Sequence, residues 1–306
     1  MKSLVILGAS SFIGNTIINY HQIIPIKAVA QSLPKTYNIK QKNISWYKVN
    51  LLNPGSLDFV LEHGDIVINL VYMHDRSGRD NSLLLKNILD SCYRKGVSRM
   101  IYCSTAGVVG CTKESQITEI TACFPLTNYE NIKYNLEHQL LQNKLKKLDI
   151  GILRPTSVVG PGGNSLHKLA LDLKSSSWLK NYLRACLYNT RPMHLVSVIN
   201  VANALLHLAL IHKPLNYNIY IVSSDEDPNN NFKQVEECLI QTMELKKRSF
   251  PIIPIPKTVL SFLLRLRGRS HFNMMRRYSS QKLRSTGFVE IDSVLSAVKL
   301  FGVSIK

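Results

Sequence analysis

The segment Leu-Val-Ile-Leu-Gly-Ala-Ser-Ser-Phe-Ile-Gly, residues 4–14, decides the fold class of this chain. Its first four residues are all apolar, which predicts a short buried strand. Gly8 then permits a tight turn, and the apolar residues from Phe12 to Tyr20 predict a helix. A strand, a glycine-rich turn and a helix in this order are typical of the first unit of a doubly wound α/β sheet, where the helix N-terminus can bind a pyrophosphate.

The alternation of short apolar runs with helical patterns continues along the chain and indicates a parallel sheet flanked by helices. Further strands are expected at residues 26–30, 45–49, 66–70, 99–103 and 150–153, and helices at 82–95 and 127–148. Beyond the break at Pro161-Gly162-Gly163-Asn164, strands are expected at 195–198 and 219–222 and helices at 201–211 and 232–243. We therefore expect a Rossmann-type doubly wound sheet in residues 1–160, with core segments near 195–225, and a smaller mixed α/β lobe over most of 161–306.

Composition and charge narrow the class of protein. The chain has 306 residues, of which 45% are apolar and 19% charged, as is usual for globular proteins with a sizeable core. The 38 Lys and Arg residues outnumber the 20 Asp and Glu residues, and the net charge of +18 favours an anionic partner. Six cysteines at scattered spacings indicate reduced thiols and a cytoplasmic location. No apolar stretch approaches the roughly 20 residues of a membrane span, so a transmembrane protein is not expected.

A second candidate site lies on the predicted helix of residues 127–148. Tyr129 and Lys133 are four residues apart, so their side chains project from one face of that helix. A neighbouring ammonium favours the phenolate, so we expect Lys133 to lower the pKa of Tyr129 and make the phenol a usable proton donor or acceptor. The hydroxyls of Ser104 and Thr105 follow the strand of residues 99–103, at the edge where such sheets bind ligands.

Taken in order, these parts resemble the extended short-chain dehydrogenase/reductase family, in particular its NAD-dependent epimerase/dehydratase branch, which acts on nucleotide sugars. The matching segments are Gly8 to Gly14, Asn50-Leu51, Asn69-Leu70-Val71-Tyr72, Thr105 with Tyr129-x-x-x-Lys133, Arg154-Pro155, and Val196 to Ala202. The resemblance covers nearly the whole chain and implies that Thr105, Tyr129 and Lys133 are catalytic. We expect NAD(P) to be bound by Gly8, Ser10, Ser11, Phe12, Ile13, Gly14, Gln31, Lys35, Asn50, Leu51, Leu70, Tyr129 and Lys133.

The chain departs from the family pattern at a few positions. Ser11 stands where the family has the middle glycine of the turn, and Asn50 stands where it usually has an aspartate. Ile199 and Asn200 replace two acids, so we expect that surface to lack its usual carboxylates. A non-catalytic NAD(P)-binding regulatory protein is therefore one alternative, although the intact catalytic trio argues against it.

Two features indicate the reaction and the cofactor. Dehydratases of this branch usually carry an Asp-Glu pair after the catalytic threonine, whereas this chain has Ala106 and Gly107, which disfavours a 4,6-dehydratase and leaves keto-sugar reduction or epimerisation. An acid after the second strand normally binds the ribose of NAD, but the first acid in this chain is Asp58. Gln31 and Lys35 follow that strand instead, which favours NADP(H).

The substrate implied by the resemblance is a nucleoside-diphosphate sugar, used in nucleotide-sugar metabolism such as polysaccharide biosynthesis. Arg191 is the candidate cation for its pyrophosphate, and Ser157 and Asn164 are expected to line the same cleft with Thr105. A reductase of a non-sugar carbonyl, such as a steroid- or flavonoid-like compound, is the alternative within enzymes, because the same trio would serve it. The resemblance also suggests a homodimer.

A basic segment, residues 257–269, alternates apolar residues with arginines and predicts an amphipathic helix that either packs on the second lobe or contacts a membrane surface. It belongs to a longer stretch, Leu245 to Val289, with eleven Lys and Arg residues and no acid. No motif supports nucleic-acid binding, and the nine histidines lack the paired spacing of a metal site. We expect His194 to be a hydrogen-bonded loop histidine near the substrate residues.

Overall fold

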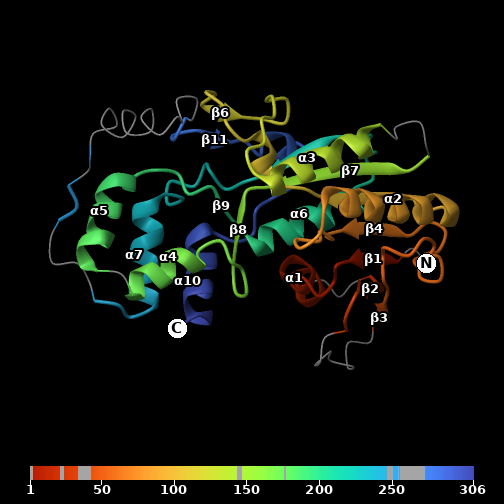
Figure 1. Cartoon of the computed structure of the whole chain (residues 1–306), viewed down its shortest axis with the longest axis horizontal. Helices are drawn as coiled ribbons and strands as arrows, with labels where there is room; N and C mark the ends of the chain where they lie inside the picture. The colour runs from red at the N-terminus through yellow and green to blue at the C-terminus, as the bar shows by residue number, and fades with distance from the viewer. Residues whose placement is uncertain are drawn as a thin grey trace. The chain divides into compact units, whose positions relative to one another are not determined.

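The structure is a computed structural model that describes residues 3–20, 24–33, 43–142, 147–175, 177–246, 251–253, 255 and 273–306 (Figure 1). Its main sheet has seven strands in the order β10-β7-β5-β4-β1-β2-β3. These strands are β1 (Leu4–Leu7), β2 (Ile26–Ala30), β3 (Ile44–Lys48), β4 (Ile66–Asn69), β5 (Arg99–Cys103), β7 (Asp149–Pro155) and β10 (Ile219–Val222). Neighbouring strands from β7 to β3 pair in parallel, with Leu4 opposite Ile26 on one side and Ile66 on the other. The predicted doubly wound α/β fold is confirmed.

The chain divides into two compact units. Unit 1 comprises Met1–Val108, Pro125–Arg154 and Val201–Tyr220, and unit 2 comprises Val109–Phe124, Pro155–Asn200 and Ile221–Lys306. The helices that accompany the main sheet are α1 (Phe12–Tyr20), α2 (Gly78–Lys95), α3 (Asn128–Leu141) and α6 (Val198–Leu210). The other elements are η1 (Ala106–Val109), β6 (Gln116–Ile117), β8 (Ser157–Val159), α4 (His167–Ser175), α5 (Trp178–Tyr188), β9 (Leu195–Ser197), α7 (Phe232–Thr242), β11 (Arg277–Tyr278), α9 (Gln281–Arg284) and α10 (Val294–Ser304).

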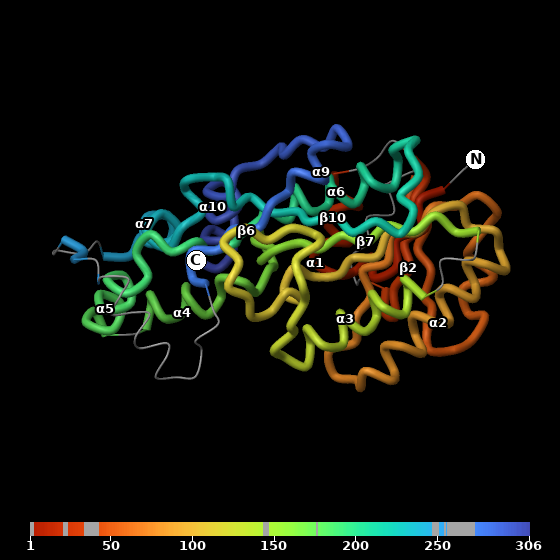
Figure 2. The backbone as a smooth tube through the Cα atoms, turned by 90° about the horizontal axis from the view of Figure 1, so that it is seen from above, coloured from red at the N-terminus to blue at the C-terminus, as the bar shows by residue number. Residues whose placement is uncertain are grey.

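Helices α2 and α3 run side by side along unit 1 in both views (Figures 1 and 2). They pack leucines and isoleucines such as Leu85, Ile88 and Leu136 against the sheet residues Val5 and Val67, and all of these side chains are buried. Ser82 of α2 donates a hydrogen bond of 2.7 Å to Gln139 of α3. This layer fixes α3, which carries Tyr129 and Lys133, relative to the strands.

Arg99 ties the opposite, amino-terminal end of β5 to the end of α6. Its guanidinium pairs with Asp149, the first residue of β7, at 2.8 Å and donates hydrogen bonds to the carbonyl oxygens of Leu208, Ala209 and Ile211. A cation at the C-terminus of a helix donates to carbonyl oxygens that have no N–H donor within the helix, and it interacts favourably with the helix dipole. Arg99 therefore attaches the end of α6 to β5 and β7, which lie much earlier in the sequence.

Unit 2 has its own core. Helices α7 and α10 pack closely, and a Cβ at Gly302 would lie 2.9 Å from a side-chain carbon of Thr242. Val235, Leu239 and Phe301 are fully buried there. Two short parallel pairs, β8 with β9 and β6 with β11, complete the unit.

Some predicted boundaries are corrected. Helix α2 begins at Gly78 rather than at residue 82, because Ser77 caps it and Asp80 completes a capping box. Helix α3 ends at Leu141 rather than at residue 148. The predicted basic helix of residues 257–269 lies entirely outside the described residues. In the part of the chain that the structure describes, no helix is long and apolar enough to cross a bilayer, and no group of three or more ligating side chains is placed to hold a metal ion.

Candidate active site

The turn between β1 and α1 fits a dinucleotide. Gly8 has φ +82°, a backbone conformation that favours glycine, and a Cβ there would meet side-chain atoms of Val71 and Leu70 at 3.3 and 3.4 Å. Gly14 lies directly against the turn, since a Cβ on it would lie 2.5 Å from the carbonyl oxygen of Gly8. The residues of this chain therefore build the close strand-to-helix approach that a pyrophosphate-binding turn requires.

Ser11, which replaces the usual glycine, caps α1. Its hydroxyl oxygen accepts a hydrogen bond of 3.1 Å from the backbone N–H of Gly14, and its own N–H donates to the carbonyl of Gly8. The Ser11 hydroxyl therefore stabilises the N-terminus of α1 by accepting a hydrogen bond from one of its free N–H groups. Among the described residues, the N–H groups of Phe12 and Ile13 have no acceptor in the chain and remain for an anion at the start of α1. Ser10 is exposed in the same turn.

The remaining predicted cofactor residues follow the carboxyl ends of neighbouring strands. Leu70 comes directly after β4 and lies next to Gly8. Gln31 comes directly after β2 and is exposed. Asn50 is exposed after β3, where its side-chain oxygen accepts from the N–H of Leu52. Leu51 beside it is buried in the core of unit 1. Lys35 falls outside the described residues.

The predicted catalytic residues Thr105 and Tyr129 come together at the carboxyl end of β5. Thr105 lies two residues after the strand, and its hydroxyl oxygen accepts from the N–H of Gly107 at 3.1 Å. Tyr129 is in the first turn of α3, which is capped by Thr127. Its ring packs edge-on against Tyr72 with a centroid distance of 5.0 Å, and it stacks on His74 at 6.0 Å. Tyr72 and His74 follow β4. Tyr72 ends the matched segment Asn69 to Tyr72 but was not predicted as a site residue, and His74 was not singled out from the sequence.

Lys133 lies one helical turn after Tyr129 and is buried. Its ammonium donates to the carbonyl oxygen of Cys103 at 2.9 Å and lies 4.9 Å from the ring centre of Tyr102 and 5.2 Å from that of Tyr72. Burial lowers the pKa of Lys133 to about 8. Thr105, Tyr129 and Lys133 thus meet within unit 1 as the sequence predicts.

The predicted effect of Lys133 on Tyr129 is wrong for this state of the chain. Burial among Tyr72, Cys103 and neighbouring groups raises the pKa of Tyr129, and only a hydrogen bond with Thr105 opposes the rise. Desolvation disfavours the phenolate more strongly than the hydrogen bond favours it. The phenol is therefore held in its protonated form, as a proton donor requires.

A buried ion pair anchors α3 behind the candidate catalytic residues. Arg154, near the end of β7, pairs with Glu137 of α3 at 2.5 Å, and both side chains are almost completely buried. Glu137 lies one turn after Lys133 on the same helix. The Arg-Pro motif therefore acts in this chain by fixing the helix that carries Tyr129 and Lys133.

Of the predicted substrate residues, Thr105 belongs to unit 1, whereas Ser157, Asn164 and Arg191 belong to unit 2. Ser157 begins β8, and its N–H donates to the carbonyl of His194 at 2.8 Å. Arg191 lies over the ring of Tyr188 at 5.2 Å, and Asn164 is exposed before α4. The hydrogen-bonded loop histidine is confirmed, because His194 Nδ1 lies 2.7 Å from Asp225 Oδ2, and His194 has φ +53°.

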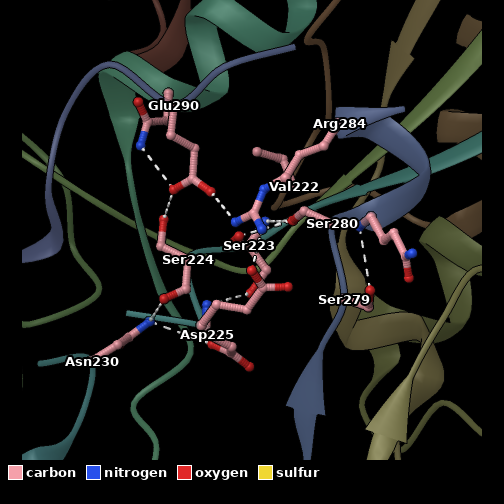
Figure 3. Close-up of polar contacts among 12 residues, drawn as sticks. Val222, Ser223, Ser224, Asp225, Asn230, Ser279, Ser280, Arg284 and Glu290 are labelled. Atoms are coloured by element: carbon pink, nitrogen blue, oxygen red, sulfur yellow. Dashed lines mark hydrogen bonds and ion pairs between the residues drawn. The ribbon is translucent and has the colours of Figure 1, made fainter. Parts of the chain in front are cut away.

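The expectation of a surface without carboxylates near Asn200 is also corrected. Asn200 is buried, and its side-chain oxygen accepts from the N–H groups of Ile291 and Asp292 while its amide donates to Glu290. Figure 3 shows the adjoining contacts, in which Ser224 donates to Glu290 at 2.5 Å and Arg284 pairs with Glu290 at 2.7 Å. Carboxylates are therefore present, but they come from the C-terminal segment.

With this geometry in place, the chain can be compared with known proteins. The profile of the NAD dependent epimerase/dehydratase family matches residues 4–219, which include the glycine turn and all three catalytic candidates. The chain belongs to this family. The resemblance inferred from its motifs is therefore confirmed.

The curated relatives of this NAD dependent epimerase/dehydratase family member include a sterol dehydrogenase. The sterol-4-alpha-carboxylate 3-dehydrogenase of Saccharomyces cerevisiae is 22% identical over 187 residues, which are 54% of each chain. The chain spans about half the length of the curated relatives it matches.

Solved structures match over the whole chain. The UDP-glucuronic acid 4-epimerase from Bacillus cereus, in complex with NAD, is 14% identical with a TM-score of 0.73, and the match covers 100% of this chain and 96% of the other. RMD from Pseudomonas aeruginosa, complexed with NADPH, is 19% identical with a TM-score of 0.68, and both chains are covered in full. At these identities the likeness establishes the shared fold.

Proposed function

We propose that this chain uses NAD(P) to reduce or epimerise a nucleotide-activated sugar. The observation that carries the proposal is the meeting of Thr105, Tyr129 and Lys133 at the carboxyl end of β5, beside the glycine turn of unit 1. In this proposal unit 1 holds the cofactor and unit 2 the nucleotide sugar.

Each catalytic residue has a defined task. Tyr129, kept protonated by burial, donates its phenolic proton to the substrate oxygen on reduction and takes it back on oxidation. Thr105 hydrogen-bonds the same oxygen and orients it. Lys133 holds α3 against the end of β5 and supplies positive charge below pH values of about 8. A bound NAD(P) would supply or accept the hydride.

The local sequence argues against dehydration. Ala106 and Gly107 follow Thr105, and a Cβ at Gly107 would already meet Thr105 Oγ1 at 3.3 Å and the Glu130 side chain at 3.4 Å. Glu130 itself is engaged in the cap of α3, where its carboxylate accepts from the N–H groups of Leu126 and Thr127. No acid directly after Thr105 is therefore available to protonate a leaving hydroxyl.

For the cofactor we favour NADP(H). Gln31 occupies the position after β2 at which an acid would bind the ribose of NAD, and Lys35 supplies a cation four residues later. For the substrate, Arg191 is proposed to bind the pyrophosphate, with Ser157 and Asn164 in the same cleft.

A reductase of a non-sugar carbonyl is the second candidate function. The observation in its favour is the match to a sterol dehydrogenase among the curated relatives. Because the catalytic trio serves either substrate, binding of the nucleotide portion separates the two functions.

Isothermal titration with UDP, after saturation with NADPH, tests the proposal. A nucleotide-sugar enzyme binds UDP, and Arg191→Ala weakens that binding by about tenfold while NADPH affinity is unchanged. Absence of UDP and other nucleoside-diphosphate binding, with NADPH bound, would favour the non-sugar reductase. A protein that binds cofactor but turns over neither class of carbonyl would be regulatory.

A further inference from the structure

Helices α4 and α5 of unit 2 present an apolar surface to solvent. Helix α5 is apolar on its outer side as well as its inner side, since Ala185 and Cys186 are buried while Leu179 and Leu183, one turn apart, are exposed. The outer apolar side chains, with their exposed fractions, are Leu171 51%, Trp178 68%, Leu179 50%, Leu183 54% and Ile253 69%. We call these five side chains the α5 surface.

The α5 surface rests on a well-connected base. Asp172 of α4 pairs with Arg184 of α5 at 2.5 Å, and its carbonyl oxygen accepts from the Asn181 amide. The segment that carries Ile253 is attached to the same helix, because Tyr182 donates to the carbonyl of Pro251 and the N–H of Ile255 donates to Cys186. The exposed side chains therefore project from a fixed support.

The two helices that carry this surface also carry an excess of cations. Helices α4 and α5 carry Lys168, Lys174, Lys180 and Arg184 against a single acid, Asp172, which pairs with Arg184 and lies 4.0 Å from the Lys180 ammonium. The Lys180 side chain is 62% exposed. The chain that leaves this region contains no acid between residues 245 and 289.

We propose that the α5 surface docks the protein on an anionic lipid bilayer. The exposed leucines match the apolar interior of a bilayer, and tryptophan and tyrosine match its interfacial region. The ring centres of Trp178 and Tyr182 lie 6.4 Å apart. The lysines of α4 and α5 match anionic headgroups. A second copy of this chain is a poorer occupant, because it would bring two sets of lysines together on a protein of net charge +18.

Vesicle co-sedimentation tests this proposal directly. The full chain should bind vesicles containing roughly one third phosphatidylserine at least tenfold better than vesicles of phosphatidylcholine alone. The double substitution Leu179→Ser with Leu183→Ser should reduce that binding by about tenfold or more. Leu83→Ser, at an exposed leucine of α2, is the matched control and should bind as the wild type does.

A second variant and a second readout distinguish a specific loss of vesicle binding from misfolding of the leucine variant. Lys168→Glu with Lys180→Glu leaves the apolar side chains in place and should also abolish the preference for anionic vesicles. In a Trp46→Phe background Trp178 is the remaining tryptophan, and its emission should shift to the blue on vesicle addition.

Two results would overturn the proposal. One is wild-type binding that is absent or independent of lipid charge. The other is a wild-type dimer in light scattering that becomes monomeric in Leu179→Ser with Leu183→Ser while neither protein binds vesicles, which would make this face an interface between copies.

Discussion

The ammonium nitrogen of Lys133 lies 2.9 Å from the carbonyl oxygen of Cys103, so one hydrogen bond joins the catalytic helix to the end of β5. The bond is buried, and burial brings the pKa of this lysine down to about 8. The nitrogen that makes this structural contact is therefore also the atom that gains and loses a proton. Its protonation gives the free energy of unfolding a characteristic pH dependence, a signature that can be measured without a substrate.

Replacing Lys133 with Met should remove that signature. The unfolded chain keeps the lysine proton up to the ordinary pKa of 10.5, whereas the folded chain releases it near 8. Between these values the unfolded state binds more protons, so the native state gains stability as pH rises. The free energy of unfolding of the wild type, minus that of Lys133→Met, should therefore increase from pH 8 to pH 10 in urea titrations. A difference that stays flat over this range would refute the assigned protonation.

Tyr129→Phe should lower kcat by about two to four orders of magnitude, because the substrate oxygen loses its proton donor. NADPH should still bind in a fluorescence titration, because the glycine turn and Lys133 are unchanged in this variant. Tyr134→Phe provides the control, since Tyr134 lies on the same helix and packs against His138. Equal losses in both variants would show that α3 is merely sensitive to substitution.

Gln31→Asp should shift the cofactor preference toward NAD. A carboxylate after β2 can accept from the ribose hydroxyls of NAD and repels the 2′-phosphate of NADP. We expect the ratio of the NAD and NADP dissociation constants to move by about tenfold or more in favour of NAD. Wild-type protein that already holds NAD tenfold more tightly than NADP would contradict the assignment of NADP(H).

Gly14→Ala should abolish cofactor binding and destabilise unit 1. The added methyl group would lie 2.5 and 2.7 Å from the carbonyl oxygens of Gly8 and Ala9, so the turn or α1 must move. Gly78→Ala is the matched control, because its Cβ would meet Ile132 at an ordinary 3.4 Å. Thermal melts with and without NADPH should separate the two variants, and a cofactor-induced shift retained by Gly14→Ala would be evidence against the role of this turn.

Much of unit 1 follows from local sequence, because the runs at residues 4–7, 26–30 and 99–103 are strands within the bounds predicted. The start of α2 was predicted four residues late, since its cap at Ser77 precedes the apolar pattern. The pKa of Tyr129 could not be predicted from its neighbour Lys133, because it is raised by burial and by Cys103 and Tyr72, which are placed by strands distant in sequence. Asn200 likewise meets Glu290 and Asp292 only through the fold of unit 2.

The contacts of Arg99 have a consequence for how this chain is made. Its guanidinium donates to carbonyl oxygens at residues 208–211, in the last turn of α6 and just beyond it, and these residues are translated more than one hundred residues after Arg99 itself. Domains fold as units when their sequence has emerged from the ribosome. The nascent protein therefore carries Arg99 and an open edge of β7 until the segment of α6 and β10 appears, and chains arrested before that point should be the ones that chaperones retain.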